Sequence, residues 1–187
     1  MEVGVHPRPV NGSVRGQMFI ADTLENGAGY AKRMEGRFEE LLDVADAYAQ
    51  GLATHGDDGP CDSSCYRCLR DYGNRSWHPL LDWRLAVDVL DLLRGRGIDF
   101  DRDAQRDARA ASALATDFNF TVEEGPVPAI TGRSGQILAV LHPFENPNAD
   151  VPSERVASVK DQWPGADFCS SFELLRRPGS LVGRLMA

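Results

Sequence analysis

The spacing of apolar residues predicts two amphipathic helices in the first half of the chain. Between Ala31 and Leu52, charged residues occupy most of the positions that separate the apolar ones. The apolar positions recur at intervals of three and four residues and are Met34, Phe38, Leu41, Leu42, Ala45, Tyr48 and Ala49. This period places them on one helical face. Leu80–Leu93 shows the same period, and Gly95 or Gly97 can end that helix.

The segment ahead of these helices has a different pattern. Residues 1–16 contain prolines and glycines and little periodicity, which predicts a flexible leader. The short apolar run Met18–Ala21 is typical of a buried strand. Gly27 and Gly29 then predict a tight turn into the first helix. A phosphate-binding loop is the alternative, although neither GxxxxGK[ST] nor GxGxxG is present.

The apolar period changes in the C-terminal half, where helix and strand patterns alternate. We expect a third, more exposed helix over Asp103–Asp117 and a hairpin turn over Thr131–Gly135. The other expected elements are strands over Phe118–Ile130, Gln136–Leu141 and Asp167–Leu174 and a helix over Ser153–Trp163. The predicted fold class is α+β, with a helical zinc-binding unit over residues 17–100 that begins with a short strand. A small β-rich C-terminal region, an α/β extension over residues 101–187, follows it.

Length and charge narrow the class of protein. The 187 residues fit one domain with a smaller appendage. The formal net charge of -8 argues against a broadly basic nucleic-acid platform, although it leaves room for a local basic patch. No apolar run approaches the 18 residues that a membrane span requires, and the N-terminus lacks a signal-peptide pattern. We therefore expect a cytoplasmic protein without a membrane partner, in which thiols stay reduced.

Three cysteines form the most informative motif. Cys61, Cys65 and Cys68 make a CxxxCxxC array among polar residues, which is not the setting of a buried apolar core. Gaps of three and two residues suit a turn that brings several sulfurs to one ion, so the array predicts a structural Zn²⁺ site. A disulfide would leave an odd thiol, and free thiols are the remaining alternative.

A closed zinc site requires a fourth donor. His55 lies six residues before Cys61 across a glycine-rich segment, and we favour it because short loops usually supply zinc ligands. His78, Cys169 and an exogenous donor are the alternatives. Each histidine could instead be an ordinary surface or capping side chain.

Catalytic motifs are not evident. The chain contains neither a Walker A motif nor a DE-x-H box, so we expect no ATPase or helicase activity from it. It reads as a detached C-terminal module or a fragment of a longer helicase. An enzyme that uses His142, Asp101 or Glu123 with a metal is a weaker hypothesis, because these residues form no catalytic spacing.

Three ordered motifs resemble a known family. They are Phe19–Asp22 through Gly27–Tyr30, the cysteine array with Leu69 and Tyr72, and Leu81–Ala86. Over residues 17–95 the chain resembles MZB, the zinc-binding C-terminal domain of DEAD/DEAH-box superfamily 2 DNA helicases. The resemblance implies a four-cysteine zinc site whose additional cysteine falls at Gly59 here. It also implies a setting in DNA repair or in DISARM-type phage defence.

The resemblance leads to a functional expectation. The chain would be a non-catalytic, zinc-stabilised module that supports DNA engagement or processing by a superfamily 2 helicase motor, in cis or in trans. The candidate DNA contacts are Arg67, Arg70, Arg75 and Arg84, with Tyr66, Tyr72 and Trp77 available for stacking on bases. These arginines could instead pair with Asp62, Asp71 and Asp82. The alternative function is a protein-interaction subunit of a repair or defence complex without direct DNA contact.

Overall fold

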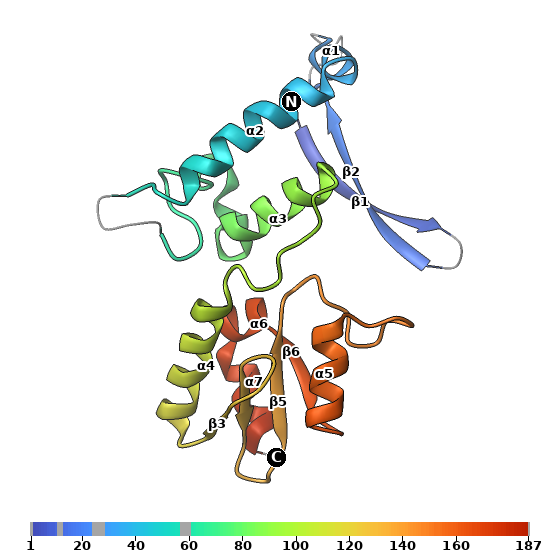
Figure 1. Cartoon of the computed structure of the whole chain (residues 1–187). Helices are drawn as coiled ribbons and strands as arrows, with labels where there is room; N and C mark the ends of the chain where they lie inside the picture. The colour runs from blue at the N-terminus through green and yellow to red at the C-terminus, as the bar shows by residue number, and fades with distance from the viewer. Residues whose placement is uncertain (1, 11–12, 24–28, 57–60, 187) are drawn as a thin grey trace. The chain divides into compact units, whose positions relative to one another are not determined.

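The chain folds into two compact units, Met1–Ile98 and Asp99–Ala187 (Figure 1). The computed structural model describes residues 2–10, 13–23, 29–56 and 61–186. Both units contain helices and strands, which confirms the predicted α+β class. No helix in these described ranges is both long and apolar enough to cross a membrane.

The first unit begins with a hairpin. β1 (Glu2–Val10) pairs antiparallel with β2 (Ser13–Ala21) along its whole length. The prediction of a flexible leader over residues 1–16 is therefore wrong, and the short strand expected at Met18 begins five residues earlier. Pro7 and Pro9 suggested a loop, but alternate prolines are compatible with a strand that has a neighbour on one side only.

Two helices replace the single helix predicted over Ala31–Leu52. α1 (Tyr30–Glu35) and α2 (Phe38–Leu52) are separated at Gly36, a residue with poor helix propensity. Of the two turn glycines, Gly27 lies outside the described residues. Gly29 has φ 68° and caps α1, a left-handed conformation that favours glycine.

The helix predicted from Leu80 begins three residues later. α3 (Trp83–Leu93) starts after Asp82, whose carboxylate accepts a hydrogen bond from the Arg84 N–H at 3.1 Å. The preceding residues form η1 (Tyr72–Leu80), a 3₁₀ segment whose N-cap is Asp71. The extended Leu81 separates η1 from α3, so Leu80 belongs to the 3₁₀ segment.

Ion pairs join α2 to the end of α3, where the two helices pack together. The Arg94 guanidinium bonds Glu39, Asp43 and Asp46, and Arg96 bonds Asp46 at 2.8 Å. The buried apolar side chains in the described part of this unit are few, namely Leu42, Ala49, Leu52 and Trp83. These ion pairs therefore supplement a small apolar core in the first unit.

The second unit is a four-stranded sheet covered by helices on both faces. Its strand order is β3-β4-β5-β6, with β6 parallel to β5 and the other neighbours antiparallel. The strands are β3 (Thr121–Glu123), β4 (Ala129–Thr131), β5 (Ile137–Leu141) and β6 (Asp167–Ser170). The helices are α4 (Ala104–Phe118), α5 (Glu154–Gln162), α6 (Ser171–Arg176) and α7 (Pro178–Met186).

Alternate strand positions build two cores, as the strand period of two requires. Ile130, Leu138 and Val140 face the cluster that includes side chains of α4, α6 and α7. Ala139 and Leu141 pack instead with the valines of α5. Each face of the sheet thus has its own helical cover.

The predicted hairpin turn of this unit is confirmed, but three other features differ from the prediction. Thr131–Gly135 joins β4 to β5, with Gly135 at φ 83°. The single strand predicted over Phe118–Ile130 is wrong: Phe118 ends α4, and β3 and β4 are separate strands, since Gly125 and Pro126 interrupt the segment between them. The predicted strand over Asp167–Leu174 ends at Ser170, because this serine accepts a hydrogen bond from the Glu173 N–H at 3.1 Å and caps α6. α7 was not predicted. The second unit therefore contains more helix than the predicted β-rich region would have.

Candidate metal centre

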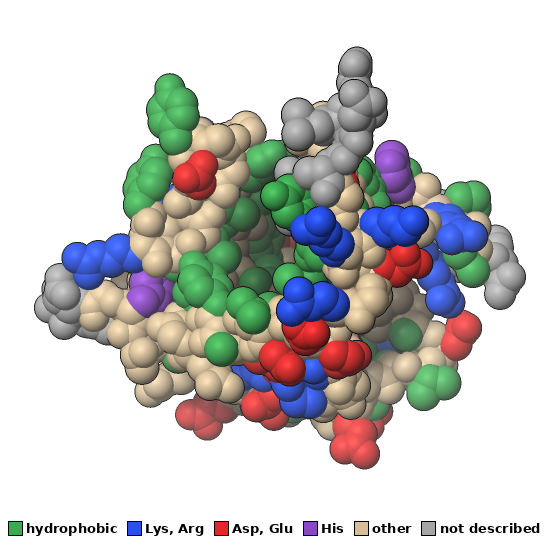
Figure 2. All heavy atoms as spheres, turned by 90° about the horizontal axis from the view of Figure 1, so that it is seen from above, with side chains coloured by type: hydrophobic (Ala, Val, Ile, Leu, Met, Phe, Trp, Pro, Cys, Tyr) green, Lys and Arg blue, Asp and Glu red, His purple; other side chains and the backbone are tan. Residues whose placement is uncertain are grey.

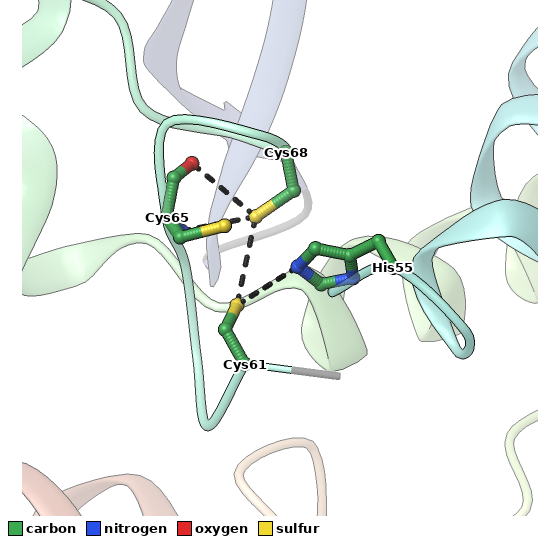
Figure 3. Close-up of side chains that lie close together, drawn as sticks. All are labelled: His55, Cys61, Cys65 and Cys68. Atoms are coloured by element: carbon green, nitrogen blue, oxygen red, sulfur yellow. Dashed lines mark hydrogen bonds between the residues drawn. The ribbon is translucent and has the colours of Figure 1, made fainter. Parts of the chain in front are cut away.

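Four side chains converge beyond the end of α2. His55, Cys61, Cys65 and Cys68 bring one donor atom each to a single point, and all four atoms lie within 4.8 Å of one another. Figure 3 shows the three sulfurs and the imidazole pointing toward one another, with His55 coming from the α2 side. The three predicted cysteines and the favoured fourth donor are thus brought together.

The spacing of these atoms suits a tetrahedral zinc ion. Zn–S bonds of about 2.3 Å in a tetrahedron separate two sulfurs by about 3.8 Å. The Sγ atoms of Cys61 and Cys68 are 3.7 Å apart, and the Nε2 atom of His55 lies 3.1 Å from the Cys61 Sγ. A set of three thiols and one imidazole is also a common structural zinc set. The residues therefore fit the ion that the sequence predicts.

The imidazole of His55 is oriented by the helix that precedes it. Its Nδ1 lies 2.5 Å from the Leu52 carbonyl oxygen, at the end of α2. A carbonyl only accepts, so this contact requires the proton on Nδ1 and leaves the Nε2 lone pair facing the sulfurs. Metal-bound histidines are commonly oriented in this way through their second nitrogen.

Backbone N–H groups point at the sulfurs. The Cys65 N–H donates to the Cys68 Sγ at 3.0 Å, and the Arg67 N–H donates to the Cys65 Sγ at 3.4 Å. The Cys65 carbonyl accepts from the N–H groups of Cys68 and Arg70, which closes a tight turn. Such donors stabilise thiolates, the form in which cysteine binds a metal.

The two helices hold this turn from both sides. The Trp83 indole N–H, at the start of α3, donates to the Cys61 carbonyl at 3.0 Å. The Tyr48 hydroxyl, on α2, donates to the Cys68 carbonyl at 2.8 Å. The Arg84 guanidinium also bonds the Asp62 carbonyl. The cluster therefore connects α2 to α3, as its position in the sequence predicts.

The thiols differ in acidity without a metal. Burial, with hydrogen bonds from Cys68 and Cys65, raises the pKa of Cys61 to about 12. Burial also acts to raise the pKa of Cys65, but hydrogen bonds from the Arg67 N–H and neighbouring side chains outweigh it and lower this pKa to about 7. Cys65 therefore loses its proton at a lower pH than Cys61.

The other predicted fourth donors lie in different settings. The Nε2 atom of His78 is 2.9 Å from the Asn74 Oδ1 and 3.0 Å from the Asp71 carbonyl, so it helps to hold η1. Cys169 is buried in the apolar core of the second unit. The position of Gly59, where the family pattern has a cysteine, lies outside the described residues.

The residues of the enzyme hypothesis do not come together as a site in the described part of the chain. His142 is buried beside the rings of Phe100 and Phe144. Asp101 pairs with Arg155, and Glu123 accepts a hydrogen bond from the Thr131 hydroxyl at 2.6 Å. These contacts give no support to a metal-assisted enzyme.

The predicted DNA contacts lie on and beside the thiol-bearing turn. Tyr72 and Trp77 on η1 are 79% and 60% exposed. Arg75 lies over the Tyr72 ring at 5.4 Å, and Arg67 is exposed on the turn. Arg70 is less available, because its Nε donates to the buried Ser64 hydroxyl at 2.9 Å.

Sequence reasoning missed the residues that support the cluster. Tyr48 was assigned to an apolar helix face and Trp83 was given no role at the site, yet both donate to carbonyl groups of the cysteine turn. Leu52 supplies a carbonyl, which no side-chain pattern can reveal. A signal for Trp83 was present, since it lies in the Leu81–Ala86 motif.

Comparisons with known proteins agree with the site. Residues 1–69 match the family model MZB, the MrfA Zn-binding domain, and this confirms the predicted resemblance over that segment. A stretch of 73 residues, 39% of the chain, is 32% identical to Druantia protein DruE of Escherichia coli (strain UMEA 4076-1). The chain covers 4% of the length of that relative. No solved structure matches.

The matched segment includes the β1–β2 hairpin and all four donor residues. Zinc is accordingly the metal of this family, and the donor set described above fits it. The matched domain is named for zinc binding and is not a catalytic motor.

Proposed function

We propose that the first unit is a zinc-stabilised, non-catalytic module that engages DNA for a superfamily 2 helicase motor, in cis or in trans. His55, Cys61, Cys65 and Cys68 are its zinc ligands in this proposal. The resemblance to the MZB family supports the association with a motor. The observation that carries DNA engagement is the group of exposed aromatic rings on the cysteine turn and on the adjacent η1.

These rings are exposed although they are large and apolar. Tyr66 is 67% exposed, and Tyr72 and Trp77 are similarly accessible. Aromatic side chains stack on unpaired bases, and each stacked base contributes about 1–3 kcal/mol. Arg75, which lies over Tyr72, adds a positive charge beside the stacking surface. A single strand supplies both bases and phosphates to such a surface.

Zinc contributes order in this proposal. The turn that carries Tyr66 and Arg67 has little apolar core beneath it, and its backbone is fixed by contacts among the cysteines. Metal binding replaces a core in segments of this kind, because the ligands are held together only when the ion is present. Binding of zinc therefore prepares the aromatic surface before DNA arrives. A reducing, cytoplasmic setting keeps the thiols available.

Salt-dependent binding to a fluorescein-labelled 20-nucleotide oligo(dT) tests this proposal. The full zinc-loaded chain should bind with an affinity that falls as salt rises. Replacing Tyr72, Arg75 and Trp77 together by alanine should weaken binding at 50 mM salt at least about tenfold, since two stacking surfaces are lost. Arg70 is left intact because its side chain supports the turn.

A control variant removes one arginine and one aromatic ring elsewhere. Arg109→Ala with Phe38→Ala targets an exposed arginine of α4 and a ring of α2 that is 45% exposed. This control should bind as the wild type does. Equal binding by the triple variant and the wild type, with zinc content unchanged, would show that η1 does not contact DNA.

A second candidate function is the protein-interaction subunit of a repair or defence complex. A groove of 430 Å³ on α1 and α2 favours it, lined by apolar atoms of Tyr30, Met34, Leu41 and Val44. The partner in that case is the motor polypeptide, consistent with the acidic net charge of -8. Recovery of the motor with the tagged chain after nuclease treatment would favour this alternative, whereas recovery only before treatment would favour DNA engagement.

A further inference from the structure

The β1–β2 hairpin carries a polar face distinct from the zinc-bound turn. In an antiparallel pair, residues directly opposite each other share one face. The register therefore places Gly4 with Phe19, His6 with Gln17, and Arg8 with Arg15 on a single face. We infer that this face of the hairpin binds the sugar–phosphate backbone of a nucleic acid.

Two arginines at directly opposed positions are the first observation. Arg8 and Arg15 are register partners, and both side chains are exposed. Like charges directly opposite each other destabilise a hairpin, so this pair reduces the stability of the isolated hairpin. An anion placed between them removes the repulsion. Figure 2 shows Lys and Arg side chains gathered toward the right-hand edge of the molecule, where Figure 1 places the hairpin.

The neighbouring side chains extend the charged pair into a binding surface. The Arg8 guanidinium donates to the Gln17 Oε1 at 3.3 Å, which orients it along the face. The His6 ring stacks on Phe19, with ring centroids 4.7 Å apart. A side chain at Gly4 would collide with the Phe19 ring, since a Cβ there would lie 2.5 Å from its Cζ. The glycine therefore leaves room for the stacked pair.

The mixture of side chains favours nucleic acid over an acidic protein segment. Guanidinium groups bind phosphate through paired N–H donors, and an exposed ring such as that of His6 can stack on a base. An acidic peptide would use the charges but would leave the stacked rings without a role. The inference goes beyond the proposed function, because it assigns a second contact surface that does not depend on η1.

Charge removal on the hairpin tests the inference in the full zinc-loaded chain. Arg8→Ala with Arg15→Ala should weaken binding of labelled 20-nucleotide oligo(dT) about tenfold at 50 mM salt. Each lost phosphate contact on a single strand lowers the salt slope by about 0.7, so the slope should fall by about 1.4. Arg8→Lys with Arg15→Lys keeps the charges and should retain the wild-type slope.

A matched control removes two exposed arginines of the second unit. Arg109→Ala with Arg133→Ala changes the net charge equally and should leave both affinity and slope unchanged. Circular dichroism and zinc content should be the same for all variants. The inference fails if the hairpin variant binds as this control does. The inference also fails if poly-L-glutamate displaces the labelled oligonucleotide as effectively as unlabelled DNA does at the same concentration of negative charge.

The proposals for η1 and for the hairpin can be rejected independently of each other. Loss of binding in the Arg8/Arg15 variant but not in the η1 triple variant would keep the hairpin surface and reject the proposed role of η1. Loss of binding in the η1 triple variant but not in the Arg8/Arg15 variant would reject only the proposed role of the hairpin. If each variant loses affinity and their combination loses more, both surfaces contact the strand.

Discussion

The indole of Trp83 and the backbone of Cys61 are joined across 22 residues by an N–H···O hydrogen bond of 3.0 Å. This bond connects the first turn of α3 to the first cysteine of the array. The backbone N–H of Trp83 also donates to the Ser63 carbonyl at 2.9 Å. A single residue therefore fixes the cysteine turn through its side chain and its main chain.

Replacing Trp83 by phenylalanine should loosen the cluster while it preserves most of the packing. The Cys61 carbonyl loses the donor of a part-buried hydrogen bond, which should lower the free energy of unfolding by about 1–3 kcal/mol. Zinc transfer to a chromogenic chelator should be faster than in the wild type. Trp77→Phe is the control, because Trp77 is 60% exposed and should change neither quantity. Identical transfer rates for the two variants would contradict a supporting role for the indole.

Replacing His55 tests the identity of the fourth ligand. His55→Ala removes the donor nearest the sulfurs and should weaken zinc binding at least about 100-fold, since even the outer partners of metal ligands contribute 10–100-fold. His55→Cys should retain one zinc per chain, because four thiolates also form a closed site. Metal content and competition with a chelator measure both effects.

His78→Ala is the matched control for these variants. Its imidazole bonds Asn74 and the Asp71 carbonyl, so this change should affect η1 and leave zinc binding intact. Unchanged zinc affinity in His55→Ala, together with weakened zinc binding in His78→Ala, would reverse the assignment.

The stability of the first unit should depend on pH through Asp46. Hydrogen bonds from Arg96, together with the charges of Arg96 and Arg94, lower the pKa of this carboxyl although burial acts to raise it. A carboxyl with a pKa below its unfolded value of about 3.9 stabilises the fold above that pH. This stabilisation is lost as the pH falls through the pKa of the folded state.

Asp46→Asn should therefore unfold more easily than the wild type at pH 6, and the difference should shrink as the pH falls toward about 3. Urea unfolding at a series of pH values measures it. Glu35→Gln, which removes an exposed carboxylate of α1, should change the free energy of unfolding only slightly. A constant difference between Asp46→Asn and the wild type across this pH range would show that the ion pairs do not contribute.

The metal cluster could be predicted from the sequence because its signal is local. Cys61, Cys65 and Cys68 lie within eight residues, and His55 lies close enough for a short loop to return it. Zinc ligands follow fixed chemistry, so residue type and spacing were sufficient. The contacts from Tyr48 and Trp83 depend on how α2 packs against α3, which no local pattern contains.

Each of the mispredicted elements has its own physical cause. The spacing of apolar residues identifies the buried face of a helix but does not reveal where the helix is interrupted. The break at Gly36 between α1 and α2 was therefore not predicted. The prolines of β1 argued against a strand in the sequence. They are tolerated in the structure because a proline destabilises a strand only where a neighbouring strand needs the missing N–H for a hydrogen bond. At Ser170 an apolar run passes from strand to helix, and the cap decides where the change occurs.

The imidazole among the thiols has an electrostatic consequence for whatever approaches the turn. A zinc ion with three thiolates and one neutral imidazole has a net charge of -1, whereas four thiolates would leave -2. The histidine thus halves the negative charge of the loaded centre while coordination stays complete. A phosphate that approaches Arg67 or Arg75 would meet less repulsion here than beside the four-cysteine site implied by the family pattern.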